Sequence, residues 1–455
     1  MKELNIIILA AGLGKRMNSS LPKVLHSLAG RSLLSHVIDT ANRLLPHKIF
    51  VVYGHGNDAI QDAIGKNELV WVKQEPQLGT GHALMQALPH LDKKGLTLVL
   101  YGDVPLISFE TLQKLISASL KENLALLTVR LDDPAGYGRI VRDTEANNII
   151  AIVEDKDTNI DQQKIKEINT GIMVIPNANL HEWLPKLENK NSQKEYYLTD
   201  IVAIAAKAGE KIEAAHPSNN WEVLGVNSKV QLAALERTYQ RNYAEKLLEQ
   251  GVTLTDPSRI DIRGKLNCGK DVEVDINCIF EGKVILNDGV KIGAHCILKN
   301  VKIGAGTTIL PFSLIEDADI GKNCRVGPFS RIRPGTNLAD EVHIGNFVEI
   351  KNSSINSGSK INHLSYIGDA TVGKKVNVGA GTITCNYDGV NKFQTVIEDD
   401  VFIGSDTQLI APVKITSGST IGAGSTITMD TLPEKLTLSR SKQRSITGWK
   451  RPTKK

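Results

Sequence analysis

The sequence has few cysteines, few aromatic residues and no long apolar run. Five cysteines occur among 455 residues, at positions 268, 278, 296, 324 and 385. Their number is odd and no two have CxxC spacing, so neither a disulfide framework nor a zinc site is expected. All five lie in the second half, which suits small fillers of a repetitive core. No apolar stretch reaches the length that crosses a bilayer, and we expect no membrane insertion.

The chain also lacks a strong charge of either sign. The formal net charge is +4, from 54 basic and 50 acidic residues, which is too weak to predict binding to nucleic acid. Hydrophobic residues make up 41% of the chain, typical of a globular protein, and its length predicts two or more domains. The apolar run Ile6–Leu9 has neither the basic flank nor the length of a signal peptide, so we expect a cytoplasmic protein.

The first half, residues 1–229, alternates short apolar runs with amphipathic segments. The runs at 6–10, 49–53, 96–101 and 125–131 are typical of strands, and 33–44 and 111–119 have helical spacing. Such alternation predicts an α/β domain with a mostly parallel sheet, whose ligands bind beyond the carboxyl ends of the strands. Residues 230–250 then have the three- and four-residue apolar spacing of one long helix, which Gly251 ends. We interpret it as a linker.

From about residue 251 to the end, aliphatic residues recur every six positions. Two unbroken series at this spacing are Ile320, Val326, Ile332, Leu338, Ile344, Ile350 and Ile397, Ile403, Leu409, Ile415, Ile421, Ile427. Glycine often follows the aliphatic residue, where we expect it to let the chain turn a corner. This is the hexapeptide pattern of a parallel β-helix, in which three hexads complete one coil. Known hexapeptide helices coil left-handed, and the resemblance implies the same hand here.

One polar insertion, 384–392, breaks the six-residue period after Gly379–Gly381. An insertion in a strict solenoid is a candidate functional loop, although surface loops also tolerate extra residues without a function.

The first apolar run leads into a glycine-rich segment, Leu9–Met17, and then Leu21-Pro22-Lys23. Backbone N–H groups at such a turn between a strand and a helix approach phosphate oxygens closely, and Arg16 and Lys23 carry charge suited to a triphosphate. The spacing matches neither a Walker A loop nor GxGxxG.

The run LAAGxGxRM…LPK resembles the signature of sugar-1-phosphate nucleotidyltransferases. Further segments fit it in chain order: Gln74 with 78–82, then 100–105, 136–139, 153–154, 169–171 and 225–227. With the hexapeptide half, the whole chain resembles the bacterial bifunctional N-acetylglucosamine-1-phosphate uridyltransferases/glucosamine-1-phosphate acetyltransferases. Two positions depart from the usual signature, because Lys15 replaces Thr or Ser and Leu224 replaces Glu. The charge of Lys15 leaves the role of its position open.

The resemblance implies a set of binding residues for UTP and the sugar phosphate in the first half. They are Leu9, Ala10, Ala11, Gly12, Arg16, Lys23, Gln74, Gly79, Thr80, Tyr101, Gly102, Asp103, Gly138, Glu154, Asn169 and Asn227. Among them, Asp103 and Asn227 are implied to hold Mg²⁺, and oxygen donors suit this hard cation. Considered without its motif, Asp103 has a less favoured alternative as a helix cap, for which Asp is a common residue.

In the second half the resemblance makes His363 the catalytic base. Transfer of an acetyl group to an amine requires a base, because an ammonium group cannot attack a thioester, and histidine suits this task. The same comparison implies a sugar-phosphate pocket of Arg333, Lys351, Tyr366, Asn377, Asn386 and Tyr387. It implies acetyl-CoA contacts by Ala380, Ser405, Ala423 and Arg440. It further implies a homotrimer. Without the resemblance, an isolated histidine is more often structural, and Arg333 and Lys351 are ordinary surface charges.

These expectations leave three readings of function. In the first, the enzyme makes UDP-N-acetylglucosamine from glucosamine-1-phosphate, acetyl-CoA and UTP, a product that feeds synthesis of peptidoglycan and lipopolysaccharide. In the second, the chain is a nucleotidyltransferase with a purely structural β-helix. In the third, it is a non-catalytic scaffold, which the presence of Lys23, Asp103 and Asn227 disfavours.

Overall fold

The computed structural model describes residues 3–12, 14–54, 58–65, 68–120 and 123–453. Leu13 of the glycine-rich motif therefore lies outside the described residues. The chain divides into two compact units, residues 1–239 and 240–455. Helix α8 (Lys229–Glu249) crosses the division: Leu235 packs into a core of the first unit, and Ala244 and Leu247 into the core of the second.

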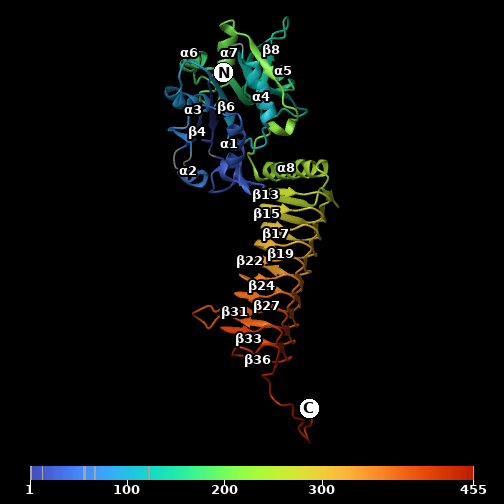
Figure 1. Cartoon of the computed structure of the whole chain (residues 1–455). Helices are drawn as coiled ribbons and strands as arrows, with labels where there is room; N and C mark the ends of the chain where they lie inside the picture. Colours follow the sequence, from blue (N-terminus) through green and yellow to red (C-terminus); the bar gives the residue numbers. More distant parts are fainter. Residues whose placement is uncertain (1–2, 13, 55–57, 66–67, 121–122, 454–455) are drawn as a thin grey trace. The chain divides into compact units, whose positions relative to one another are not determined.

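A mostly parallel sheet forms the centre of the first unit (Figure 1). Its strand order is β11-β7-β10-β6-β1-β4-β5, and β10 alone of these is antiparallel to its neighbours. The bounds are β1 Leu4–Leu9, β4 Lys48–Gly54, β5 Leu69–Gln74, β6 Leu96–Tyr101, β7 Leu124–Arg130, β10 Glu167–Pro176 and β11 Ile212–Ala215. The paired strands β8 (Arg139–Arg142) and β9 (Ile149–Val153) join through β10.

Helices cover both faces of this sheet because its strands are apolar on both sides. In β1, Ile6 and Ile8 face a core with α1 (Leu33–Arg43), α2 (Asp58–Ile64) and α4 (Phe109–Ala118). Ile7 and Leu9 face the opposite core with α3 (Thr80–Ala87), α6 (Asn177–Trp183) and α7 (Asp200–Lys207). The predicted α/β architecture is confirmed. A short helix, α5 (Ile160–Gln163), lies outside these two layers.

The second unit is a parallel β-helix, as the hexads predict (Figure 1). One of its sheets stacks the strands β12 Thr253–Leu254, β14 Glu273–Val274, β16 Lys291–Ile292, β18 Thr308–Ile309, β20 Arg325–Val326, β23 His343–Asn346, β26 Lys360–His363, β29 Asn377–Val378, β32 Phe402–Ile403, β35 Thr420–Ile421 and β37 Leu436–Thr437. The remaining faces share a second sheet, because β19 (Leu314–Ile320) pairs with both β21 (Arg331–Ile332) and β22 (Thr336–Leu338).

The coil length follows from the strand register. Val326 pairs with Ile344, eighteen residues later, and Ile344 pairs with Ile361, seventeen later. Every member of the two aliphatic series is buried. The pairing of Val378 with Ile403 spans 25 residues, so the insertion at 384–392 is extruded from a single coil without breaking the stack.

Among the glycines that follow an aliphatic residue in the repeats, Gly327 has a φ of 105°, as expected for a turn, but others have a different role. The corners contain residues with positive φ, such as Phe312 (φ 61°) and Phe329 (φ 55°). Gly321 has no positive φ; instead a Cβ there would lie 2.5 Å from the backbone of Ala339 in the next coil. Close approach between coils therefore requires the glycine.

Candidate functional site

The first candidate site is a cavity of about 680 Å³ beyond the carboxyl ends of β1 and β6. Fifteen of the sixteen residues implied for the nucleotide and sugar line it: Leu9, Ala10, Ala11, Gly12, Arg16, Lys23, Gln74, Gly79, Thr80, Tyr101, Asp103, Gly138, Glu154, Asn169 and Asn227. Gly102 is the exception, because it is buried and its N–H donates to the carbonyl oxygen of Leu9.

The glycine-rich loop forms one wall of this cavity. It leads into two 3-10 turns, 15–17 and 23–25, before the first α-helix begins at Leu33, which differs from the expected direct entry into a helix. Gly14 has a φ of 60°, and a Cβ there would lie 2.8 Å from Cβ of Lys23. Glycine at position 14 thus lets the loop fold back on Lys23. Lys15 also lines the cavity.

A cation and two oxygen donors meet at the end of β6. The Lys23 ammonium is hydrogen-bonded to the Asp103 carboxylate and lies 3.2 Å from Oδ1 of Asn227. Lys23 and Asp103 side chains are each 13% exposed. Asn227 is brought there by Val226, whose N–H donates to the carbonyl oxygen of Asp103 over 2.9 Å.

This arrangement fits a hard divalent cation. The two oxygens already converge on one positive group, Lys23. No cluster of three or more His, Cys, Asp or Glu side chains suited to a metal occurs within the described part of the chain. A metal held by Asp103 and Asn227 would therefore keep several positions for phosphate oxygens and water, as Mg²⁺ does in nucleotide sites.

Glu154 and Tyr101 also line the cavity. Burial raises the pKa of Glu154, while a 2.9 Å hydrogen bond from the Thr199 hydroxyl opposes that shift. Burial also raises the pKa of Tyr101, helped by the charges of Glu154 and Asp103. Nearby, Oδ1 of Asn169 accepts a 3.0 Å hydrogen bond from the N–H of Gly171. The Tyr101 hydroxyl and the Asn169 amide are neutral and lie in the same cavity as the Glu154 carboxylate, a set of polar groups that suits the hydroxyls of a sugar.

Sequence reasoning missed several residues of this cavity, including Gln77, Tyr137 and Thr199. Gln77 donates a 2.6 Å hydrogen bond to the carbonyl oxygen of Ala11, which secures the start of the glycine-rich loop. Its signal was its place between Gln74 and the segment 78–82, which the resemblance named.

The second candidate site begins at His363, at the end of β26. Its side chain is exposed, and its Nδ1 lies 2.9 Å from Oδ1 of Asn346 in the preceding coil. Since an amide oxygen only accepts, this contact places the proton on Nδ1 and leaves Nε2 as the basic nitrogen.

A column of backbone contacts runs from His363 along one corner of the β-helix. The N–H of Gly381 donates to the carbonyl oxygen of His363, and the N–H of Asp406 donates to the carbonyl oxygen of Ala380. The N–H of Gly424 then donates to the carbonyl oxygen of Ser405. Lastly, Nη1 of Arg440 donates to the carbonyl oxygen of Ala423 over 2.7 Å. The corner thus brings together His363 and the residues implied for acetyl-CoA: Ala380, Ser405, Ala423 and Arg440.

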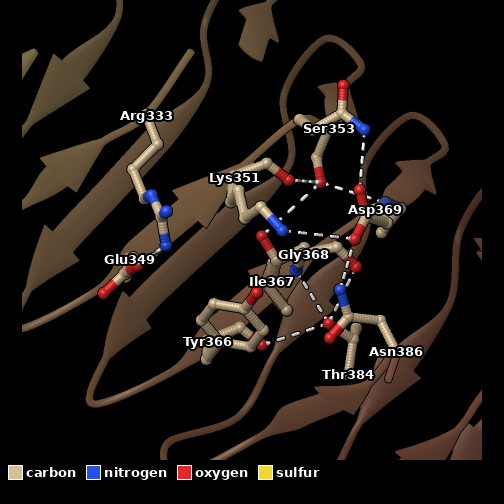
Figure 2. Close-up of polar contacts among 12 residues, drawn as sticks. Arg333, Glu349, Lys351, Ser353, Tyr366, Ile367, Gly368, Asp369, Thr384 and Asn386 are labelled. Atoms are coloured by element: carbon tan, nitrogen blue, oxygen red, sulfur yellow. Dashed lines mark hydrogen bonds and ion pairs between the residues drawn. The ribbon is translucent and has the colours of Figure 1, made fainter. Parts of the chain in front are cut away.

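The cationic residues implied for the sugar phosphate lie on neighbouring coils of another face (Figure 2). Arg333 donates a 2.8 Å hydrogen bond to Glu349, and Nζ of Lys351 lies 3.6 Å from the Asp369 carboxylate. Glu349 and Tyr366 are paired in register between β24 (Glu349–Lys351) and β27 (Tyr366–Gly368). Sequence reasoning missed both acidic partners.

The remaining implied residues lie at the insertion and in β29. Asn386 is buried and donates to the Asp369 carboxylate, so the start of the insertion is tied to the coil that carries Tyr366. Tyr387 is 59% exposed. Asn377 is half-buried in β29, between Lys360 and Phe402 in register.

Comparisons with known proteins agree with this division. Residues 6–252 match the MobA-like NTP transferase domain, and 394–428 match the bacterial transferase hexapeptide repeats. Residues 262–348 match the GMPPB C-terminal domain. The bifunctional protein GlmU of Nitrosospira multiformis is 68% identical over 455 residues, which cover 100% of this chain and 99% of that protein. The chain belongs to the GlmU family.

Other members of the GlmU family are similar over the same length. The protein of Nitrosomonas eutropha is 62% identical over 455 residues, 100% of this chain and 99% of its own. That of Ralstonia nicotianae is 60% identical over 451 residues, 99% of each chain. The family predicted from the sequence motifs is therefore confirmed. Within the described residues, no helix combines the length and apolarity needed to cross a membrane.

Proposed function

We propose that the two activities of the GlmU family are divided between the two units of this chain. The chain is a bifunctional transferase that acts on small molecules to make UDP-N-acetylglucosamine. Its β-helix transfers acetyl from acetyl-CoA to glucosamine-1-phosphate. Its α/β unit joins the product to UTP with release of pyrophosphate. The observation that carries this proposal is the presence of two separate sites, the cavity of Lys23 and Asp103 and the corner of His363, in one chain.

The proposed domains follow these sites. Residues 1–229 form the nucleotidyltransferase domain, 230–250 the linker helix, and 251–455 the acetyltransferase domain. We also propose a homotrimer in the cytoplasm. Parallel β-helices expose their sides to possible partners, and both cosubstrates are metabolites of the cell interior.

Uridylyl transfer uses positioning and charge. The glycine-rich loop, with Gln74, Gly79 and Thr80, binds UTP, and Gly138, Glu154 and Asn169 bind the sugar. A phosphate oxygen of the sugar phosphate forms a bond to the α-phosphorus of UTP, and the bond from that phosphorus to pyrophosphate breaks. Lys23, Arg16 and Lys15 neutralise phosphate charge. Asp103 and Asn227 would hold Mg²⁺, which supplies further neutralisation of the triphosphate when bound.

Acetyl transfer uses His363 as the base. Its Nε2 takes a proton from the ammonium group of glucosamine-1-phosphate, and the freed amine attacks the thioester carbonyl carbon. A carbon–nitrogen bond forms, the carbon–sulfur bond breaks, and a proton goes to the coenzyme A thiolate. Arg333, Lys351, Tyr366, Asn377, Asn386 and Tyr387 hold the sugar phosphate. Ala380, Ser405, Ala423 and Arg440 hold acetyl-CoA along their shared corner.

Product analysis tests this proposal. The full chain is incubated with glucosamine-1-phosphate, acetyl-CoA, UTP and Mg²⁺, and the products are separated by chromatography. We expect UDP-N-acetylglucosamine from the parent, and from His363→Ala only when N-acetylglucosamine-1-phosphate is supplied. If the parent also requires the acetylated sugar phosphate, the β-helix is a structural module and the proposal is wrong for that half.

A further inference from the structure

Asp369 lies where three successive coils of the β-helix meet. It follows β27 with a φ of 50°, and its carboxylate is 13% exposed. Oδ1 accepts a 2.6 Å hydrogen bond from Nδ2 of Asn352, one coil earlier. Oδ2 accepts from Nδ2 of Asn386, one coil later, and lies 3.6 Å from Nζ of Lys351 (Figure 2). One carboxylate thus contacts two residues proposed for the sugar phosphate.

The carboxylate determines which way the Asn386 amide faces. An ionised carboxylate only accepts hydrogen bonds, so the amide nitrogen must face it and the amide oxygen must point elsewhere. Figure 2 shows the Asn386 nitrogen directed at Asp369. Asn386 thereby presents an acceptor rather than a donor on its other side, which suits a sugar hydroxyl or an ammonium group.

The same carboxylate balances the charge of Lys351. The Lys351 side chain is only 20% exposed, and a partly buried ammonium is costly without an anion. A lysine ammonium has three donors, so one contact with Asp369 leaves others for a phosphate. Burial would raise the pKa of Asp369, but hydrogen bonds from Asn352 and Asn386 and the charges of Lys351 and Lys392 outweigh it and lower that pKa. The group is therefore charged at neutral pH.

We propose that Asp369 is a positioning residue of the acetyltransferase site, which orients the Asn386 amide and holds the Lys351 ammonium for the sugar phosphate. This inference rests on the function proposed for the β-helix. Asp369 does not contact acetyl-CoA in this scheme. Its replacement should therefore weaken binding of glucosamine-1-phosphate and leave binding of acetyl-CoA unchanged.

Asp317 provides a matched control. It occupies the same corner three coils earlier, with a φ of 44°, and accepts a 2.9 Å hydrogen bond from Asn300, as Asp369 does from Asn352. It has neither Lys351 nor Asn386 beside it. Asp317→Asn therefore makes the same side-chain change at the same corner of the coil, at a position that is more exposed than Asp369, without the proposed function.

The test is steady-state kinetics of acetyl transfer by the full chain. We expect Asp369→Asn to raise KM for glucosamine-1-phosphate roughly tenfold or more, as loss of a charge-assisted contact predicts, with KM for acetyl-CoA unchanged. Asp317→Asn is expected to match the parent. Uridylyl transfer from N-acetylglucosamine-1-phosphate and the Tm of both variants serve as internal checks of folding.

Different failures have different meanings. No acetyl transfer by the parent would overturn the function proposed for the β-helix. An unchanged KM for glucosamine-1-phosphate in Asp369→Asn, or an equal change for both substrates, would overturn the positioning role alone. If Asp369→Asn does not fold, Asn352→Ala carries the test, because it releases the carboxylate from the side away from Lys351 and Asn386. We expect a rise of about threefold in the same KM, as loss of one hydrogen bond predicts; no rise rejects the inference.

Discussion

The Nδ1 atom of His363 lies 2.9 Å from Oδ1 of Asn346, its register partner one coil earlier in the β-helix. Neighbouring strands of a parallel sheet hold such a pair in place, so the imidazole is oriented by the fold itself. The contact also selects the tautomer in which Nε2 is the base. Asn346 is therefore expected to act on catalysis without touching the substrate.

Replacing Asn346 by Ala tests this orientation. The imidazole loses its partner, so we expect kcat for acetyl transfer to fall about tenfold, as the loss of one orienting hydrogen bond predicts. KM for acetyl-CoA and uridylyl transfer should stay at parental values. Asn337→Ala, at an exposed position in β22, is the control. A parental kcat in Asn346→Ala would show that His363 needs no such support.

Metal removal should separate the two activities. Asp103 and Asn227 converge on Lys23, whereas the corner of His363 needs no metal in the proposed scheme. We expect a chelator to abolish uridylyl transfer and to leave acetyl transfer unchanged. Added Mg²⁺ should restore uridylyl transfer. Asp103→Asn should raise the Mg²⁺ concentration for half-maximal uridylyl transfer by at least about tenfold, because a neutral amide is a weaker ligand than a carboxylate. The exposed Asp92→Asn is the control. Equal Mg²⁺ requirements in the two variants would contradict the assignment.

The pKa of Glu154 makes a prediction about stability and pH. Burial raises this pKa above its ordinary value of 4.5. At a pH between the pKa of Glu154 in the unfolded chain and its raised pKa in the folded protein, the folded protein binds more protons than the unfolded chain. The free energy of unfolding therefore falls as the pH rises through that window. Glu154→Gln cannot ionise, so it does not lose this part of the free energy of unfolding. Its Tm should exceed that of the parent at neutral pH, and the difference should vanish below about pH 4.5.

Thermal unfolding of both proteins from pH 4 to pH 8 measures this difference. The same variant should bind N-acetylglucosamine-1-phosphate less tightly, because the carboxylate lines the proposed sugar end of the cavity. A Tm difference that stays constant with pH would mean that burial of Glu154 has no cost in the folded state.

Periodic features of this protein could be predicted from the sequence. The aliphatic series containing Ile344 has a spacing that only a solenoid explains, and the alternation of strands and helices before residue 229 specifies the parallel sheet. Short motifs were as informative: residues that they named between Leu9 and Lys23, and Asp103, line one cavity. These signals are local, and each lies within a few dozen residues of chain.

Contacts between coils were harder to predict. Asn346, Glu349 and Asp369 contact site residues that are 16 to 18 positions distant, and nothing in their immediate neighbours marks them. The spacing of seventeen that relates Asn352, Asp369 and Asn386 was visible in the sequence, but its meaning depends on the coil length. Gly102, which a motif named, is buried and does not line the cavity, so its part in binding stays a prediction.

The glycine positions of the β-helix allow a final prediction, because they fall into two physical classes. At Gly321 a Cβ would lie 2.5 Å from the backbone of the next coil, and backbone cannot rotate away as a side chain can. At Gly424 the φ is 69° but a Cβ would meet nothing within 4 Å. We expect Gly321→Ala to cost about 3 kcal/mol of unfolding free energy by overpacking, and Gly424→Ala about 1 kcal/mol for the left-handed backbone. Chemical denaturation followed by circular dichroism measures both. Equal costs would mean that the coils can separate to admit a methyl group, and that backbone conformation, rather than close approach, explains the glycines of the hexads.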